Sequence, residues 1–396
     1  MKILHIVYQS LPNISGSSIR TRDIVMAQRD VGLNPVVVSS PFQNGISDSE
    51  LDIINDIKHY RTYNNKPDYL VKESKTPLNK RILKSFAIFS FYKKVKLILS
   101  VEKPDILHAH ATFFCAIVAI VLGRKFKIPV VYEVRSLWEE REKNGANNYI
   151  KKIQPKIISY IETECMKRAD KVIVINENLR QNISDRGIRN VEVITNAVSL
   201  SLIDKTIDYN QTFPLRFGYI GSVSPIEGLD LIIKLWAKLE SEEFTNKFYI
   251  YGSGTFLNEL INLKENLGVK NVIFKGRVES DKINLAFKNI DVIINPRIKS
   301  KISDTVTPLK PLEAMAYKKL VIASDVGGMK ELITDNFNGI LFKSDSLEAL
   351  ERSIMQLVKN GLDFKIISQA YKYVTENRSW SNNAKKYDII YKKLKT

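Results

Sequence analysis

The stretch that decides the fold runs from Asn295 to Phe342: NPRIKSKISDTVTPLKPLEAMAYKKLVIASDVGGMKELITDNFNGILF. An apolar run typical of a buried strand, Asp291–Asn295, leads into it, and a second such run, Leu320–Ala323, lies within it. Between the two runs the sequence predicts a polar loop and a short helix, roughly Leu309–Tyr317. Strand, loop, helix and strand in this order predict an α/β fold with a parallel sheet and helical crossovers.

The start of the short helix has the features of an anion site. Pro308 and Pro311 lie in its first turn, where a missing N–H group costs little. The N–H groups of Leu309 and Lys310 are then left at a positive helix end, which attracts phosphate. Lys310 adds a full charge, and Arg297 lies on the preceding loop. The alternative is an ordinary surface loop that caps a helix.

The runs PLKPLEAMA, VIASDVGGMKEL and NGILF resemble the donor-binding signature of the family 4 retaining glycosyltransferases. The resemblance is to the subgroup that combines P-R with P-L-K-P-L-E-A-M-A, and it implies the GT-B architecture, two Rossmann-like domains facing across a cleft. The family has two Glu residues with seven positions between them. Glu313 matches the second, which in the family holds the ribose hydroxyls, whereas Thr305 stands in place of the first.

Composition sets broad limits. A chain of 396 residues predicts two domains. The sequence contains no apolar run of about eighteen residues, so no membrane-spanning helix is expected. The first residues, MKILHIVYQS, are typical of a strand rather than a signal peptide, and Cys115 and Cys165 fit no metal spacing, so a cytoplasmic protein is expected. The net charge of +17 favours an anionic partner, but no nucleic-acid-binding module is recognisable.

The N-terminal half opens with a βαβ pattern. Lys2–Tyr8 predicts a strand, a glycine-containing loop opens a helix, and Pro35–Ser39 predicts the next strand. The loop does not match G-x-G-x-x-G, so the pattern by itself does not indicate a nucleotide site. The resemblance implies that Gly16 and Ser17 offer backbone N–H groups to the pyrophosphate of the donor.

Polar residues end the next two predicted strands. His108 and His110 in DILHAH share one face of their strand, and its carboxyl end lies where ligands bind in open α/β sheets. The resemblance implies that His110 contacts the donor sugar; a structural histidine is the alternative. Glu133 and Arg135, at the end of the following strand, suit acceptor or sugar binding, or else pair with each other structurally.

The second half begins again with strand, glycine loop and helix, LRFGYIGSVSPIEGLDLIIKLWAKL from Leu215. This repetition predicts two similar domains, 1–205 and 214–379, with a linker at 206–213. The amphipathic end of the chain, 380–396, is expected to return to the first domain, as it does in the family.

The glycine loop of the second half departs from the family pattern. The family has Arg after the first loop glycine and Lys before the second, whereas Ser222 and Glu227 stand here. The resemblance therefore implies that Arg297 and Lys310 supply the missing charge for the diphosphate. It also implies the following donor-binding residues: Gly221, Ser222, Gly252, Arg277, Val278, Leu309 and Glu313.

The segment 80–96 interleaves lysines with aromatic residues. Such a basic amphipathic helix can lie on an anionic membrane surface. The alternative is two core-packed helices with lysine-rich outer faces.

The resemblance, together with these patterns, implies a retaining, metal-independent hexosyltransferase, cytoplasmic and peripheral on the membrane. It would move a sugar from a nucleotide diphosphate sugar, with a UDP-sugar favoured and a GDP-sugar as the alternative, to a lipid-linked glycan acceptor in surface polysaccharide synthesis. The nucleotide sugar is a co-substrate and no cofactor is expected; His110, Lys310 and Arg297 are the predicted catalytic residues. Two alternatives stay open: a non-catalytic sugar-nucleotide-binding partner protein, and a basic nucleic-acid-binding α/β protein.

Overall fold

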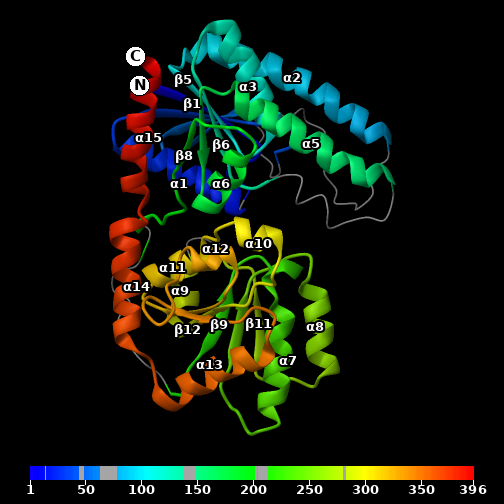
Figure 1. Cartoon of the computed structure of the whole chain (residues 1–396), viewed down its shortest axis with the longest axis vertical. Helices are drawn as coiled ribbons and strands as arrows, with labels where there is room; N and C mark the ends of the chain where they lie inside the picture. Colours follow the sequence, from blue (N-terminus) through cyan, green and yellow to red (C-terminus); the bar gives the residue numbers. More distant parts are fainter. Residues whose placement is uncertain are drawn as a thin grey trace. The chain divides into compact units, whose positions relative to one another are not determined.

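The computed structural model describes residues 1–13, 15–43, 49–62, 78–137, 149–200, 203, 213–279 and 282–396, without the side chains of 78–86 and 149–154. The chain forms two compact units (Figure 1). The first consists of Met1–Thr195 and Trp380–Thr396, and the second of Asn196–Ser379. The end of the chain therefore returns to the first unit, as the sequence predicts.

The first unit is built on an eight-stranded sheet in the order β3-β4-β2-β1-β5-β6-β7-β8. Only the β3–β4 pair is antiparallel among the described strand pairs. The strands are β1 Lys2–Val7, β2 Asn34–Ser39, β3 Leu51–Ile54, β4 Ile57–Arg61, β5 Ile106–His110, β6 Val130–Val134, β7 Lys171–Val174 and β8 Val191–Val193. The central strands are buried along almost their whole length, as expected for parallel strands covered on both faces.

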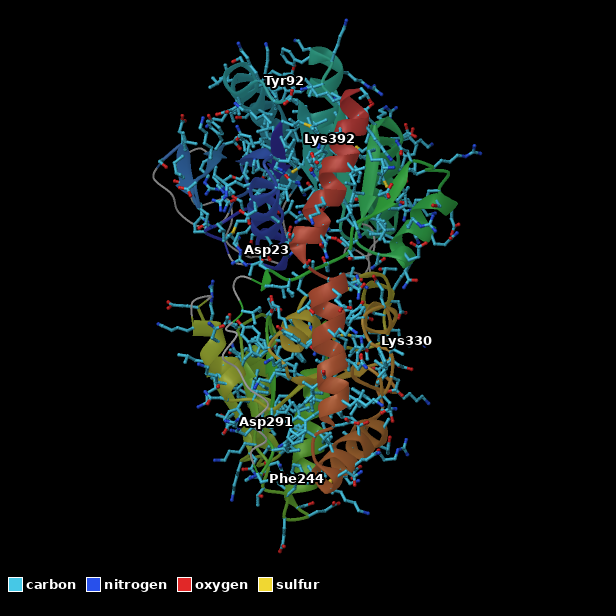
Figure 2. All side chains as sticks on the ribbon, turned by 90° about the vertical axis from the view of Figure 1, so that its left-hand side faces the viewer. Asp23, Tyr92, Phe244, Asp291, Lys330 and Lys392 are labelled. Carbon is cyan, nitrogen blue, oxygen red and sulfur yellow. The ribbon has the colours of Figure 1, made fainter. Side chains whose placement is uncertain are left out.

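Helices cover both faces of this sheet, and α15 packs on α1 while α3 packs on α2 and α5. The helices are α1 Gly16–Asp30, α2 Leu78–Glu102, α3 Phe113–Phe126, α5 Tyr149–Arg168, α6 Glu177–Asp185 and α15 Trp380–Lys395. Ser15 and Ser18 form a reciprocal capping box that fixes the start of α1. The exposed side chain of Lys392 marks the outer side of α15 in Figure 2.

The second unit contains a six-stranded parallel sheet in the order β11-β10-β9-β12-β13-β14. The strands are β9 Phe217–Ile220, β10 Phe248–Tyr251, β11 Val272–Gly276, β12 Val292–Asn295, β13 Leu320–Ser324 and β14 Ile340–Phe342. The helices are α7 Leu229–Glu240, α8 Leu257–Asn266, α9 Ile283–Lys288, α10 Lys301–Thr305, α11 Lys310–Ala316, α12 Gly327–Lys330, α13 Leu347–Asn360 and α14 Phe364–Asn377.

Both sheets have the strand order of a doubly wound fold. In each, the chain first winds outward in one direction, returns to the centre and winds in the other, with the reversal between β1 and β5 and between β9 and β12. Ligands of open α/β sheets bind beside such a reversal, at the carboxyl ends of the strands. The predicted α/β fold with two Rossmann-like domains is confirmed.

The predicted boundary between the domains is placed too late. The second unit already begins at Asn196, because Val198 forms a β-bridge with Ser379 and the Asn196 amide donates to the carbonyl oxygen of Thr307 at 2.5 Å. The predicted linker 206–213 lies outside the described residues except for Phe213. None of the described helices is long and apolar enough to cross a bilayer.

Candidate active site

The strand order brings most of the predicted site residues to the two reversal points. In the first unit, Gly16 and Ser17 open the helix after β1, and His110 ends β5. In the second unit, Gly221 follows β9 and Arg297 follows β12. Each unit therefore has its own candidate site at the carboxyl ends of its strands.

The loop after β9 depends on close backbone approach. Gly221 has a φ of +152°, and a Cβ there would lie only 2.1 Å from Cε of Lys310. A Cβ at Gly252, which follows β10, would lie 1.8 Å from the carbonyl oxygen of Gly221. Glycine at position 221 allows the Lys310 side chain to lie directly over the loop, and glycine at position 252 allows the backbone after β10 to approach that loop.

Lys310 and Arg297 both bind the carboxylate of Glu227. Arg297 contacts both oxygens, with Nη2 at 3.0 Å from Oε1 and Nε at 3.3 Å from Oε2. The Lys310 ammonium lies 3.2 Å from Oε1 and also donates to the hydroxyl of Tyr219. That hydroxyl donates in turn to the Ser222 carbonyl oxygen at 2.7 Å. The pair of cations predicted for the diphosphate thus forms a cluster with an internal anion.

Most of the Lys310 side chain is buried. Only 19% of it is exposed, because it folds back across the loop after β9. Burial lowers the pKa of Lys310 to about 8, although Glu227 opposes the shift. Burial raises the pKa of Glu227, but Lys310 and Arg297 outweigh it and hold that pKa at about 2. The cluster therefore carries a net charge of one positive unit near neutral pH.

The other predicted donor residues lie at the same edge of the second sheet. Arg277 and Val278 follow β11, Leu309 is the N-cap of α11, and Glu313 lies in its first turn. Asp304, next to the position of the family's missing Glu, accepts a hydrogen bond from the N–H of Gly327 at 2.7 Å. It therefore holds the start of α12.

In the first unit, the carboxylate of Glu133 is the centre of a buried polar cluster. Its Oε1 accepts hydrogen bonds from Nε of Arg135 at 2.8 Å and from Nε of Arg20 at 3.1 Å. Its Oε2 accepts a hydrogen bond from the hydroxyl of Tyr387 on α15. Glu133 is fully buried, and its pKa is held well below the usual range by the two guanidinium groups in spite of the burial that raises it.

Arg135 joins this cluster to the first glycine loop. Its Nη1 donates to the carbonyl and hydroxyl oxygens of Ser17, at 2.8 and 3.0 Å, and to the hydroxyl of Thr21 at 3.1 Å. Its Nη2 lies 2.7 Å from Nδ1 of His110. The structure therefore favours the structural alternative for Glu133 and Arg135, because their polar atoms face protein partners; their role toward acceptor or sugar stays a prediction.

His110 begins a directed chain of hydrogen bonds. Arginine can only donate, so Nδ1 of His110 accepts from Arg135, and a neutral ring carries its proton on Nε2. Nε2 of His110 lies 2.8 Å from Nδ1 of His5, and Nε2 of His5 lies 2.9 Å from Oε1 of Gln28. Each ring thus accepts at Nδ1 and donates at Nε2.

The chain continues onto the C-terminal helix. Gln28 donates to the hydroxyl of Tyr391 at 2.9 Å, and that hydroxyl lies 2.7 Å from Nδ1 of His108. Nε2 of His108 has no hydrogen-bond partner in the described part of the chain, and the Glu133 carboxylate lies 3.7 Å away. Hydrogen bonds therefore hold both His108 and His110 in the protein interior, and His110 is only 1% exposed.

The three histidines, His5, His108 and His110, are spaced closely enough to hold a metal ion, with one ligand atom of each within 4.8 Å of the others. The contact with Arg135 decides against this use. If Nε2 of His110 bound a metal, the proton of its neutral ring would move to Nδ1 and face the Arg135 donor 2.7 Å away. The residues present fit a hydrogen-bonded chain and do not fit a resident metal.

Sequence reasoning missed the partners that complete the Glu133 cluster and this chain of hydrogen bonds. His5, Gln28, Tyr387 and Tyr391 come from one strand and two helices, and α15 lies far from β5 in the sequence. The available signal was a histidine inside an otherwise apolar first strand, since His5 pairs in register with His108.

We expect the protein to lose stability in mild acid. Burial lowers the pKa of His5 and His108 well below 6.5 and that of His59 and His110 to about 4. Below about pH 6.5 the unfolded chain therefore binds more protons than the folded one. The free energy of unfolding should fall with decreasing pH, by up to roughly 1.4 kcal/mol per pH unit for each histidine.

Urea unfolding between about pH 7.5 and pH 5 measures this effect. His59 lies outside the chain of hydrogen bonds that contains the other three histidines. His59→Gln should reduce the slope of the unfolding free energy against pH by the equivalent of about one proton. The lowered carboxylate pKa values contribute only below about pH 4.5 and do not interfere. A stability that stays constant over this range would show that the histidines titrate in the folded protein as they do in the unfolded chain.

Replacing His110 with Ala should lower stability as well as turnover. The change leaves Arg135 Nη2 and the Nδ1 atom of His5 without their partner, and each buried unpaired group costs about 1–3 kcal/mol. His110→Gln, whose amide can both accept and donate, should recover part of the stability. Thermal unfolding and turnover of both variants, with His108→Ala for comparison, test this; a silent His110→Ala would contradict it.

The helix predicted to contact membranes is α2, of which the structure describes side chains from residue 87 onward. Phe91 and Val95 are buried in the first unit, whereas 59% of Phe89 is exposed and the Lys93 ammonium lies 4.4 Å from its ring centre. Part of the aromatic content therefore belongs to the core, and part lies on a basic outer face.

Comparison with known proteins gives the family. The model "Glycosyltransferase Family 4" matches residues 14–202, and "Glycosyl transferases group 1" matches residues 210–386. The chain is 26% identical to the uncharacterized glycosyltransferase MJ1069 of Methanocaldococcus jannaschii, over 58% of this chain and 59% of that protein. It is 21% identical to MJ1178 of the same organism, over 100% and 99% of the two chains. It is 25% identical to the alpha-monoglucosyldiacylglycerol synthase of Streptococcus pneumoniae, over 65% and 60%.

Solved structures share the fold. Sucrose-phosphate synthase from Thermosynechococcus elongatus superposes with a TM-score of 0.79 at 15% identity, over 99% of this chain and 98% of that one. Anabaena HepE in complex with UDP-glucose gives a TM-score of 0.72 at 18% identity, over 99% and 100%. Both units of the chain thus match glycosyltransferase models, both sheets have the Rossmann-like order, and the chain is a GT-B glycosyltransferase of family 4/5 type.

Proposed function

We propose that this glycosyltransferase takes its sugar from a nucleotide diphosphate sugar and transfers it with retention of configuration. The observation that carries the proposal is the placement of Arg297 and Lys310 at the reversal point of the second sheet, with Lys310 lying over Gly221. The likeness to HepE with bound UDP-glucose supports a UDP-sugar as the first donor to try.

The cations would act on the leaving group. Two of the three N–H groups of Lys310 are accounted for by Tyr219 and Glu227, which leaves one for a phosphate oxygen. As the bond to the sugar breaks, negative charge grows on the diphosphate, and fixed cations stabilise that charge without reorganising. The acceptor hydroxyl would attack from the same face of the sugar as the leaving diphosphate, which retains the configuration.

A thermal-shift screen against UDP-sugars and GDP-sugars tests the donor class. A ligand that binds only the folded protein raises its melting temperature, so one group of nucleotide sugars should stabilise the protein and the others should not. Turnover of the stabilising sugar should follow with a suitable acceptor. Stabilisation without donor hydrolysis or transfer would indicate a non-catalytic sugar-nucleotide-binding protein instead.

We also propose that transfer needs no metal, because Arg297 and Lys310 would supply positive charge for the diphosphate. Turnover should then be unchanged when a chelator such as EDTA is added, and added Mg²⁺ should not raise it. Loss of activity in EDTA, with recovery on adding a divalent cation, would show that the protein charges are insufficient.

For the acceptor we propose a lipid-linked glycan reached at a membrane surface through α2. The exposed Phe89 beside Lys93 supports this, as does the likeness to a synthase whose name indicates a glycolipid product. Binding to anionic vesicles should weaken at high salt and when Lys93, Lys94 and Lys96 are replaced by Glu. Unchanged vesicle binding by the triple variant would exclude this surface.

A further inference from the structure

Glu227 stands at the loop position where the family pattern has a lysine, and its carboxylate is buried beside two cations. It is 5% exposed, and both carboxylate oxygens contact the cations of the candidate donor site. A ligand diphosphate and this carboxylate therefore compete for the same positive charge.

The backbone holds Glu227 in this position. It ends the 3₁₀ turn Pro225–Glu227, and the following Gly228 has a φ of +66°. A Cβ on Gly228 would lie 2.1 Å from the carbonyl oxygen of Pro296, so glycine lets this turn pack directly against the loop that carries Arg297. A hydrogen bond of 3.1 Å from the N–H of Ile298 to the carbonyl oxygen of Ile226 joins the same two segments.

We propose that Glu227 is a built-in counter-ion that limits how tightly the site holds the nucleoside diphosphate product, and so permits its release. This inference rests on the proposed function, since it assumes that Arg297 and Lys310 bind the diphosphate. Cleavage converts a diphosphate diester into a nucleoside diphosphate whose terminal phosphate gains a negative charge. Two unopposed cations would favour this more negative product over the donor, and Glu227 offsets one of them.

The expected size of the effect follows from the distances. A carboxylate that contacts both cations lies within about 5–7 Å of phosphates bound to them, where the interaction between charges is strong in a partly buried site. Neutralising it should tighten nucleoside diphosphate binding by about tenfold or more. Nucleoside monophosphates, which carry less charge, should gain less.

The experiment compares the full-length protein with Glu227→Gln, using UDP, GDP, UMP and GMP as probes. Without ligand, Glu227→Gln should melt at a lower temperature, because two clustered cations lose their counter-ion. The diphosphate that the wild type binds should raise the melting temperature of Glu227→Gln by more than it raises that of the wild type. Its Kd for the variant should be lower by about tenfold or more. In turnover, kcat should fall and product inhibition should strengthen. A merely structural role would lower the melting temperature and weaken the ligand as well.

Two further variants keep the result interpretable. Glu331→Gln removes a carboxylate of the same unit that pairs with Arg378 at 3.6 Å, and it should leave the ligand-induced shift unchanged. The double variant Lys310→Gln with Glu227→Gln has fewer unopposed cations than Glu227→Gln alone, so it remains useful if Glu227→Gln does not fold. It should bind the diphosphate more tightly than Lys310→Gln does. Equal or weaker binding in both backgrounds overturns the inference alone. If the wild type binds neither UDP nor GDP, the proposed donor site is wrong as well.

Discussion

Replacing Glu133 by Gln is expected to lower the free energy of unfolding by about 3–5 kcal/mol, because it removes one partner of a buried ion-pair cluster. Glu133 is fully buried and accepts from both Arg20 and Arg135. The variant leaves two buried guanidinium groups with one less charge to neutralise them. It also turns an amide N–H toward donors, since a carboxylate has only acceptors and Gln does not.

The size of this loss can be measured by urea or thermal unfolding of the variant and of two controls. Tyr387→Phe removes the hydrogen bond that this hydroxyl donates to Oε2 of Glu133 and should cost about 1.5–3 kcal/mol, less than Glu133→Gln. Glu164→Gln removes a surface carboxylate on α5 that pairs with Lys167 and Arg168, and it should leave the melting temperature nearly unchanged. If Glu133→Gln is as mild as Glu164→Gln, the cluster does not stabilise the first unit.

Glu133→Gln should also disturb the placement of the first glycine loop. Arg135 holds Ser17 by two hydrogen bonds, and Glu133 orients Arg135. We therefore expect Glu133→Gln to raise the KM for the donor at temperatures where the variant is still folded. An unchanged KM would separate the stability of the cluster from the placement of the loop.

The fold could be predicted from the sequence because its signals are local. Each buried strand is a short apolar run, and the glycine loops after β1 and β9 mark the start of each unit. The short α11 and its proline-rich start are equally local. The predicted position of the domain boundary is less accurate, because the pairing of Val198 with Ser379 joins residues far apart in the chain.

The candidate sites could be predicted only in part. A strand end shows that a residue such as His110 or Glu133 lies at the ligand-binding edge, but not what covers it. In this protein Tyr387 and Tyr391 of α15 complete the polar cluster from the other end of the chain. The direction of the Glu227 carboxylate depends on the turn at Gly228, so its pairing with Arg297 and Lys310 became visible only in the structure.

Replacing Lys310 by Ala is expected to lower kcat/KM by about ten- to a hundredfold. A hydrogen bond to a charged group contributes roughly 1.5–3 kcal/mol, which corresponds to this range. Charge on the leaving diphosphate increases as the bond to the sugar breaks, so the loss should appear in kcat as well as in KM. Arg297→Ala should have a similar effect, and it should also destabilise the protein, because Glu227 loses its two-point partner.

The pH dependence separates Lys310 from Arg297. Burial lowers the pKa of Lys310 to about 8, so the free enzyme loses this charge as the pH rises through that value. Since kcat/KM reports the free enzyme, it should fall above about pH 8 in the wild type. Lys310→Arg, whose charge persists, should be less sensitive over the same range, and Lys330→Ala, an exposed lysine on α12, should behave as the wild type.

The decisive comparison uses both cations. A diphosphate in a partly buried site needs its charge neutralised, and the family's usual positions hold Ser222 and Glu227. Arg297 and Lys310 contact that Glu227 and lie at the carboxyl edge of the second sheet. If Lys310→Ala and Arg297→Ala both kept the wild-type kcat/KM with the natural donor, other groups would have to hold the diphosphate. The cluster would then be a structural ion pair, and the fall in activity above about pH 8 should be absent as well.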